Sequence, residues 1–188
     1  LEGLNLNIDE NELEYLKNDS EGTFCEEVTI DVEKLEPLCS CPHEVDNVDE
    51  IKNVAGVKID QAYIGSCTGG RYHDLKVAAD LVKGRKIAEG IRLLISPASK
   101  EVWDRCAKEG ILQILSDAGA TVLASSCGAC LGIHSGALGE GEVCISSTNR
   151  NFIGRMGSKK SSVYLASPLS VIASAIKGEI TDPREFMK

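Results

Sequence analysis

Three cysteines in two glycine-rich segments are the residues of this chain best suited to chemistry. Cys127 and Cys130 stand three positions apart in "SSCGACLGIHSG" (125–136), and Cys67 lies in "GSCTGGR" (65–71). A C-x-x-C pair occurs in dithiol redox pairs, in halves of zinc sites, in disulfides and in iron–sulfur sites. The spacing by itself leaves all four chemistries open.

Regular hydrophobic patterns around these segments predict the elements that position them. Strands are expected over 56–65, 91–97 and 120–125, and helices over 70–84 and 97–117. Strands that alternate with helices of this length form parallel sheets with helices on their faces. The chain is therefore expected to contain a three-layer α/β/α domain with a mostly parallel sheet.

The same alternation continues near the C-terminus. Residues 162–167 have the pattern of a strand, and the helix that follows has Ser167 at its N-cap and Pro168 at its first position. That helix is expected to end at Gly178, because glycine readily adopts the left-handed conformation that closes a helix.

The N-terminal part lacks this regularity. Residues 1–55 are interpreted as the tail of a preceding domain plus a linker, and residues 56–188 as the α/β domain. Within the tail, 1–22 predicts a short helix, and the alternation in "CEEVTIDVEKL" (25–35) predicts a half-buried strand. The linker is placed at 35–51, which contains prolines and a short acidic run.

The two cysteine segments follow strands of the expected sheet. Because ligands bind beyond the carboxyl ends of parallel strands, Cys67, Cys127 and Cys130 are expected on one edge of the sheet. The glycines let the backbone approach a bulky group, and successive N–H groups can bind sulfides or anions. Cys67 also precedes a helix, and a helix N-terminus favours the thiolate form.

Several cofactors fit thiolates placed in this way. The glycines of "CGACLG" argue against the firm helix start of a thioredoxin-like dithiol. Structural zinc needs four ligands, which the three cysteines with His134 would supply, as would a group built on Cys39, Cys41 and His43. A [4Fe–4S] cluster held by three cysteines leaves one iron without a protein ligand, and that iron is an open Lewis acid.

A pair of arginines follows the cysteines in "STNRNFIGR" (147–155). Arg150 and Arg155 are close together there among small polar residues. Arginine is the natural bidentate partner of a carboxylate, although a solvated basic loop has the same composition. Beside an open iron, the arginines would suit a hydroxy acid with several carboxylates.

Composition narrows the class of protein. The 188 residues carry a net charge of −9, which disfavours nucleic acid and anionic membranes as partners. No run reaches the roughly 18 apolar residues of a membrane helix, and no signal sequence precedes the domain, so a cytoplasmic location is expected. Eight cysteines without a secretory signal favour metal or redox use over structural disulfides.

Three motifs together carry a resemblance to a known family. "IGSCTGGR", "CGACLG" and "STNRNFIGR", in this order and spacing, resemble the aconitase superfamily, and most of all the large subunits of 3-isopropylmalate dehydratase and homoaconitase. The likeness runs from about Phe24 to the C-terminal "SPLSVIASAIKGEITDPREF". Family large subunits are longer than this chain, which resembles the end of their second domain and all of their third.

The resemblance implies a cofactor and a reaction. It places a [4Fe–4S] cluster on the three cysteines and a substrate-binding role on Asn149, Arg150 and Arg155. It implies a hydro-lyase that isomerises a small polycarboxylate by dehydration and rehydration, working with a small, swivelling subunit. The acid–base residues would lie in the remainder of the large subunit, so that none is assigned here and this chain alone would be incomplete and inactive. Gly69 stands where many relatives have asparagine.

The remaining cysteines and histidines have plainer interpretations. Cys106 and Cys144 are expected in the core, and His73 and His134 as ordinary hydrogen-bonded side chains near the cysteine segments. Two rival functions stay open: an isolated, inactive fragment, because the chain begins without methionine, and a zinc-binding or dithiol module.

Overall fold

The computed structural model describes residue 14 and residues 16–187. The chain divides into two units, Leu1–Leu35 and Glu36–Lys188. The helix expected within 1–22 falls mostly on residues outside the described ones.

Residues 25–35 do not form the expected half-buried strand. Their only regular element is one 3-10 turn, η1 (Val32–Lys34), and Val28 and Ile30 are exposed. The alternation of apolar and polar residues was a misleading signal, because a strand also needs a neighbour that accepts its hydrogen bonds. Within the described part of the chain, no strand pairs with this segment.

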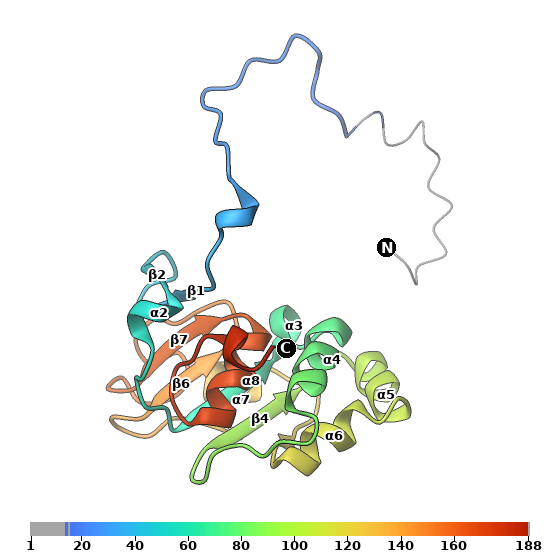
Figure 1. Ribbon diagram of the computed structural model, residues 1–188, viewed down its shortest axis with the longest axis vertical. Helices are drawn as coiled ribbons and strands as arrows, with labels where there is room; N and C mark the ends of the chain where they lie inside the picture. The colour runs from blue at the N-terminus through green and yellow to red at the C-terminus, as the bar shows by residue number, and fades with distance from the viewer. Residues whose placement is uncertain (1–13, 15, 188) are drawn as a thin grey trace. The chain divides into compact units, whose positions relative to one another are not determined.

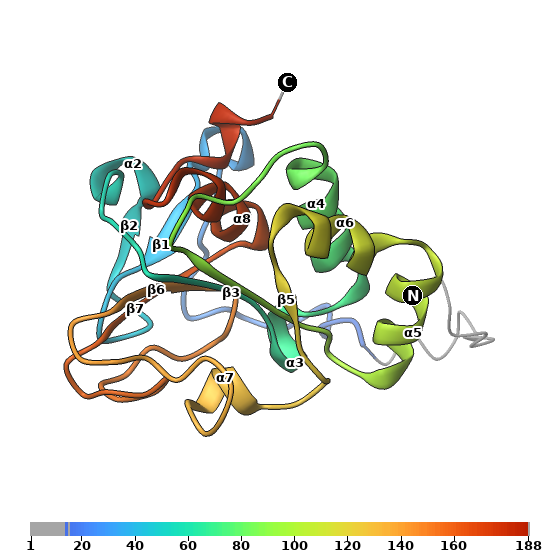
Figure 2. The same ribbon diagram turned by 90° about the horizontal axis from the view of Figure 1, so that it is seen from below.

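A seven-stranded sheet forms the centre of the second unit (Figures 1 and 2). Its order is β2-β1-β7-β6-β3-β4-β5. The five parallel strands are β3 (Gln61–Gly65), β4 (Arg92–Ser96), β5 (Thr121–Val122), β6 (Val143–Ser146) and β7 (Ser162–Ala166). The mostly parallel α/β fold expected from the sequence is confirmed.

The segment interpreted as a linker belongs to this sheet. Within 35–51, β1 (Leu38–Ser40) pairs antiparallel with β2 (Val48–Glu50) and with β7, where Cys39 faces Ala166. The linker interpretation was therefore wrong for these residues, because strands of three residues are too short to show a period. That residues 1–35 are the tail of a preceding domain stays a prediction.

Helices cover one face of the sheet (Figure 2). They are α4 (Tyr72–Val82), α6 (Ile111–Ala118) and α8 (Pro168–Lys177), and α5 (Lys100–Lys108) packs against α4 and α6. The expected ends of α8 are confirmed, since the Ser167 side chain accepts from the Ser170 N–H and Gly178 has a φ of 81°. The single helix expected over 97–117 is two helices, because Gly110 adopts a φ of 73° between them.

Short elements complete the second unit. They are α2 (Ile51–Val54), α3 (Ser66–Gly69), α7 (Gly128–Leu131) and the 3-10 turn η2 (Pro183–Glu185). The face of the sheet opposite the long helices is covered by α7 and loops, where Tyr63, Cys130 and Met156 belong to a second buried cluster. No helix in the described ranges has the length and apolar character needed to cross a membrane.

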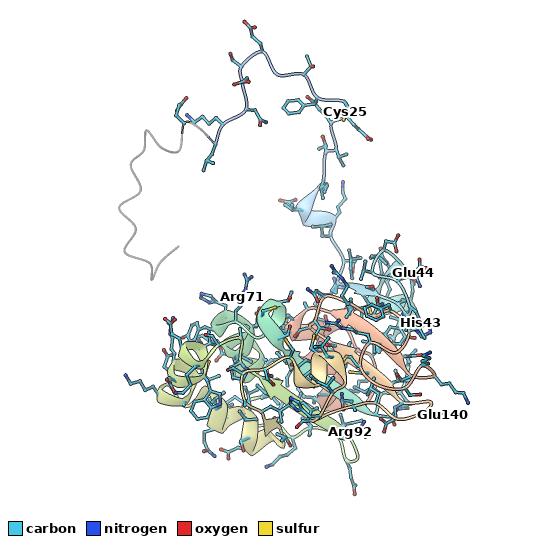
Figure 3. The ribbon with its side chains drawn as sticks, turned by 180° about the vertical axis from the view of Figure 1, so that it is seen from behind. Cys25, His43, Glu44, Arg71, Arg92 and Glu140 are labelled. Carbon is cyan, nitrogen blue, oxygen red and sulfur yellow. The ribbon has the colours of Figure 1, made fainter. Side chains whose placement is uncertain are left out.

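Arginines mark the two ends of the parallel strands (Figure 3). At the amino ends, Arg92 donates to both carboxylate oxygens of Glu142, at 2.8 and 2.6 Å, and to the Gln61 side chain at 3.1 Å. At the carboxyl ends, Arg71 follows α3 and precedes α4. The cysteine segments lie at this second end.

Candidate functional site

Cys67 lies just beyond the carboxyl end of β3, in α3. Its side chain is exposed. The chain turns out of the strand at Ser66, whose φ of 70° is uncommon for a residue other than glycine. The Ser66 hydroxyl accepts a hydrogen bond from the Thr68 N–H and so supports the turn from within. The strand end therefore places the Cys67 thiol at the predicted edge of the sheet.

Cys127 and Cys130 lie at the two ends of one helical turn. Cys127 is the N-cap of α7 and is exposed, whereas Cys130 is buried within that turn. The glycines were expected to argue against a firm helix start, but one helical turn begins directly after Cys127. Gly128 instead makes room for His134, since a Cβ at that position would lie 2.0 Å from the imidazole. The helix-start argument against a dithiol pair no longer applies.

A buried tyrosine connects the two cysteine segments. The Tyr63 side chain is fully buried on the α7 face of β3. Burial, with smaller contributions from the nearby Cys130 and Cys127, raises the pKa of its hydroxyl to about 12, while Ser96 and the Ser66 backbone act in the opposite direction. One hydroxyl therefore lies near both the α3 segment and the α7 segment.

Arg155 is in direct contact with one of these cysteines. Its Nη2 donates a hydrogen bond to Cys130 Sγ at 3.3 Å, and the guanidinium lies 5.5 Å from the centre of the Phe152 ring. Arg150 is exposed and donates to the Asn149 carbonyl at 2.7 Å. The structure thus brings Arg155 to the cysteines and leaves Asn149 and Arg150 on the surface.

Ser147 joins the loop after β6 to the Cys67 segment. Its hydroxyl accepts from the Gly65 N–H at 3.1 Å and donates to the Gly69 carbonyl at 3.0 Å, and its own N–H donates to the Tyr63 carbonyl at 3.0 Å. A Cβ on Gly69 would lie 2.2 Å from the Ser147 carbonyl oxygen, so the glycine permits this close approach. Ser147 begins the "STNRNFIGR" motif, but its type and spacing gave no reason to assign it a role.

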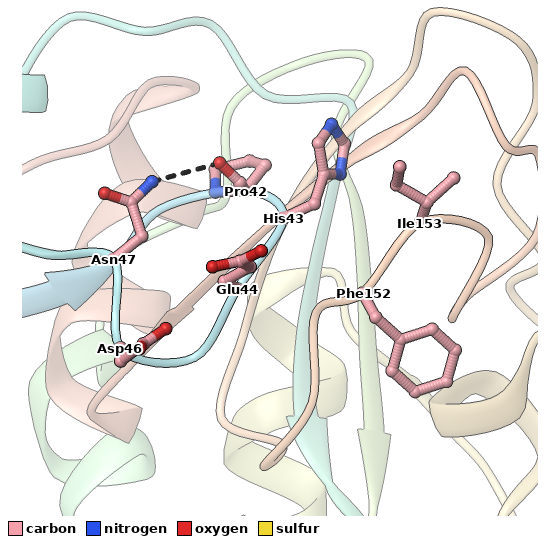
Figure 4. Close-up of a pocket in the computed structure, with 7 residues that line it drawn as sticks. All are labelled: Pro42, His43, Glu44, Asp46, Asn47, Phe152 and Ile153. Carbon is pink, nitrogen blue, oxygen red and sulfur yellow. Dashed lines mark hydrogen bonds between the residues drawn. The ribbon is translucent and has the colours of Figure 1, made fainter.

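Asn151 ties the same loop to the segment before β2. It is fully buried, and its Nδ2 donates to the Cys41 carbonyl at 2.9 Å and to the Glu44 carbonyl at 3.3 Å. Beside it is a cavity of about 870 Å3, in which all of residues 42–47 except Val45 face Phe152 and Ile153 (Figure 4). The link could not be predicted from the sequence because the partners of Asn151 are remote along the chain.

The other singled-out residues have structural roles or lie on the surface. Cys106 and Cys144 are fully buried, as expected for core residues. His73 is exposed and its ring packs edge-on against Tyr72. His134 is exposed, and its Nδ1 accepts from the Ser135 N–H at 2.7 Å.

The arrangement of the three thiols bears on the kind of metal group that they would hold. Among residues 16–187, no three His, Cys, Asp or Glu side chains lie close enough to hold one metal ion. This includes both groups considered for zinc. A four-iron cluster spans a larger volume and takes its thiolates from positions farther apart. The two exposed thiols and the buried one, set in glycine-rich turns around an orphaned tyrosine hydroxyl, fit such a group.

Comparison with known proteins identifies the class to which this fold and site belong. The model of the aconitase family (aconitate hydratase) matches residues 5–178. The chain therefore belongs to the aconitase family, as the three motifs indicated.

Among curated proteins of this family, the chain is similar to large subunits of 3-isopropylmalate dehydratase and homoaconitase. The chain is 48% identical to 3-isopropylmalate dehydratase large subunit 1 of Methanopyrus kandleri over 95% of this chain and 46% of that protein. It is 50% identical to 3-isopropylmalate dehydratase large subunit 1 of Archaeoglobus fulgidus, over 92% and 41%. It is 46% identical to the homoaconitase large subunit of Thermus thermophilus, over 92% and 41%. The chain spans less than half the length of each of these relatives.

Proposed function

We propose that this chain is the cluster-bearing part of a hydro-lyase that isomerises a 2-hydroxy di- or tricarboxylic acid by dehydration and rehydration. The observation that carries the proposal is the 3.3 Å hydrogen bond from Arg155 to Cys130 Sγ. It joins a group suited to substrate carboxylates to a thiol suited to a cluster. Family membership and the names of the relatives support the reaction class.

Cys67, Cys127 and Cys130 would hold a [4Fe–4S] cluster. When bound there, the cluster supplies an iron without a protein ligand, which acts as a Lewis acid on the substrate hydroxyl and carboxylate. The chain presents these thiols from two turns at one edge of the sheet, and Ser147 fixes the Cys67 turn through Gly65 and Gly69.

The residues around the cysteines would bind the substrate. Arg155 has a buried Nε without a hydrogen-bond partner in the described structure, so its guanidinium retains a free donor. A carboxylate beside Cys130 would accept from that arginine, and the exposed Arg150 and Asn149 would bind a second carboxylate from the solvent side. General acid and base groups would come from the remainder of the large subunit, and a small subunit would complete the enzyme. A cytoplasmic location stays a prediction.

Anaerobic reconstitution tests the cofactor assignment. The chain is incubated with ferrous iron and sulfide, desalted, and analysed for iron, sulfide and visible absorbance. We expect near-equal iron and sulfide, and loss of both in Cys127→Ser. Cys25→Ser, which changes another exposed thiol that is not among the three proposed ligands, is the control and should retain the cluster. Zinc without sulfide, or a reversible Cys127–Cys130 disulfide with no iron uptake, would instead support the metal or dithiol module.

A substrate panel tests the reaction. A full-length large subunit with this segment is mixed with its small subunit and assayed on isopropylmalate, homocitrate-type acids and citrate. We expect dehydration of at least one acid, with Arg155→Lys raising KM at least tenfold because a point charge replaces a bidentate donor. The absence of turnover with every acid, despite a full cluster, would refute the proposed reaction.

A further inference from the structure

The side chain of Tyr63 has a polar atom that the fold itself leaves unused. It is fully buried in the strand that leads to Cys67, and its hydroxyl has no hydrogen-bond partner among the described residues. A buried hydroxyl without a partner is unfavourable, and such groups are rare in folded proteins. This hydroxyl therefore indicates a missing acceptor.

The nearest protein groups do not supply that acceptor. Ser96 and the Ser66 backbone lie near the phenol and lower its pKa. Neither forms a hydrogen bond with the Tyr63 hydroxyl in the described structure, and the Ser96 hydroxyl donates instead to the Ala124 carbonyl at 2.9 Å. The remaining neighbours are the thiols of Cys127 and Cys130, and Cys130 packs in the same buried cluster as Tyr63.

One glycine keeps space open beside the hydroxyl. A Cβ on Gly65 would lie 2.6 Å from the Tyr63 oxygen, so any other residue there would displace it. The hydroxyl thus lies beside the turn that carries Cys67, and Cys130 of the other turn belongs to the same buried cluster as Tyr63.

We propose that Tyr63 donates its phenolic hydrogen to a sulfur atom of the cluster held by these cysteines. The inference rests on the proposed cluster. Hydrogen bonds to cluster sulfurs stabilise the reduced, more negative state and raise the reduction potential. Tyr63 would also slow loss of the cluster, because its buried hydroxyl would hydrogen-bond one of the cluster's sulfur atoms.

Tyr63→Phe removes the donor and keeps the ring. Its matched control is Tyr164→Phe, which makes the same change at a half-buried tyrosine packed against the helix-covered core. Each variant of the chain is reconstituted anaerobically, and the cluster is titrated with dithionite under EPR detection. We expect a more negative potential in Tyr63→Phe, with cluster loss in air about tenfold faster, the factor that corresponds to one hydrogen bond to a charged group. Tyr164→Phe should match the unchanged chain in both.

Melting of the metal-free chain separates this role from a structural one. Without the cluster the hydroxyl lacks a partner, so Tyr63→Phe should melt no lower than the unchanged chain. A lower melting temperature for metal-free Tyr63→Phe, or a potential and loss rate equal to those of the unchanged chain, overturns the inference. If the unchanged chain takes up no cluster, the proposed cofactor fails, and this inference fails with it. A Tyr63→Phe variant that cannot retain a cluster, with metal-free melting unchanged, supports it.

Discussion

Replacing Asn151 tests whether its side chain holds two segments of the second unit together. Its Nδ2 donates to the Cys41 carbonyl at 2.9 Å and, at 3.3 Å each, to the Glu44 carbonyl and the Ser40 hydroxyl. These bonds connect the loop of the proposed substrate-binding residues to the segment between β1 and β2. We expect Asn151→Ala to release that segment and to lower the free energy of unfolding.

The size of the effect follows from how buried each partner is. A net hydrogen bond contributes about 1 kcal/mol, and a buried group left without a partner costs about 1–3 kcal/mol. The Cys41 carbonyl belongs to a half-buried residue, whereas Glu44 is exposed and water can replace the lost donor. The Asn151 Oδ1 is itself buried without a partner in the described structure, so its removal offsets part of the loss. The expected sum is about 2 kcal/mol, or a fall of about 4–8 °C in melting temperature.

Urea unfolding followed by circular dichroism measures this change. Asn53→Ala is the control, because exposed Asn53 makes one hydrogen bond, to Asp49 at 2.7 Å, and its loss should cost less than about 0.5 kcal/mol. If Asn151→Ala is as stable as Asn53→Ala, the loop is not held by this side chain and the reasoning is refuted.

Asn151→Asp adds a pH test with a defined sign. The new carboxyl would face carbonyl oxygens, so burial and these acceptors would raise its pKa in the folded state above its ordinary value. The protonated form can still donate one hydrogen bond. A raised folded-state pKa means that stability is present at low pH and is lost as pH rises through that pKa. The deficit of Asn151→Asp should therefore be smaller at pH 4 than at pH 7, and an equal deficit at both would count against the geometry.

Three further predictions concern other parts of the unit. Gly132→Ala should lower the free energy of unfolding in urea by at least about 2 kcal/mol, because φ is +63° and the new Cβ would lie 2.4 Å from the Met156 backbone. The control is Gly90→Ala, with φ of +83° and open space around the new Cβ, which should cost only about 1 kcal/mol. Glu142→Gln should lower the free energy of unfolding by about 0.5–1 kcal/mol at neutral pH. Arg92 holds the pKa of Glu142 below its ordinary value, so the stabilisation is lost as pH falls through that lowered pKa, and the variant should lose less stability on acidification than the unchanged chain. Cys144 should resist alkylation at pH 8 in the folded chain and react in urea, as mass spectrometry would show, because burial raises the pKa of its thiol to about 12.

Local signals in the sequence were sufficient for the strand–helix alternation and for the placement of the cysteine segments. The end residues of α8 were predictable because a cap depends on residues within one turn of the helix. The edge position of Cys67 followed from the rule that loops after parallel strands gather at their carboxyl ends. These inferences needed no knowledge of which strands are neighbours.

The failures share a physical cause, which is dependence on partners far away in sequence. Residues 25–35 have a strand-like alternation without a pairing strand in the described structure, and residues 38–40 form a strand because β7 lies beside them. Ser147 and Asn151 could not be singled out because their hydrogen-bond partners come from β3 and from the β1–β2 segment. Gly110 was missed for a different reason, since one glycine in a helical pattern is often tolerated.

The antiparallel pairing of β1 has a consequence for the order in which the chain can fold. Ser40 and Asn151 lie 111 positions apart, and β1 enters the sheet only beside β7, which is made later still. A chain that emerges from the ribosome N-terminus first must therefore carry its β1–β2 hairpin unpaired while the parallel strands assemble. The wall of the cavity formed by residues 42–47 is then among the last parts to be fixed. The β1–β2 hairpin can therefore join the sheet only after β7 has been synthesised.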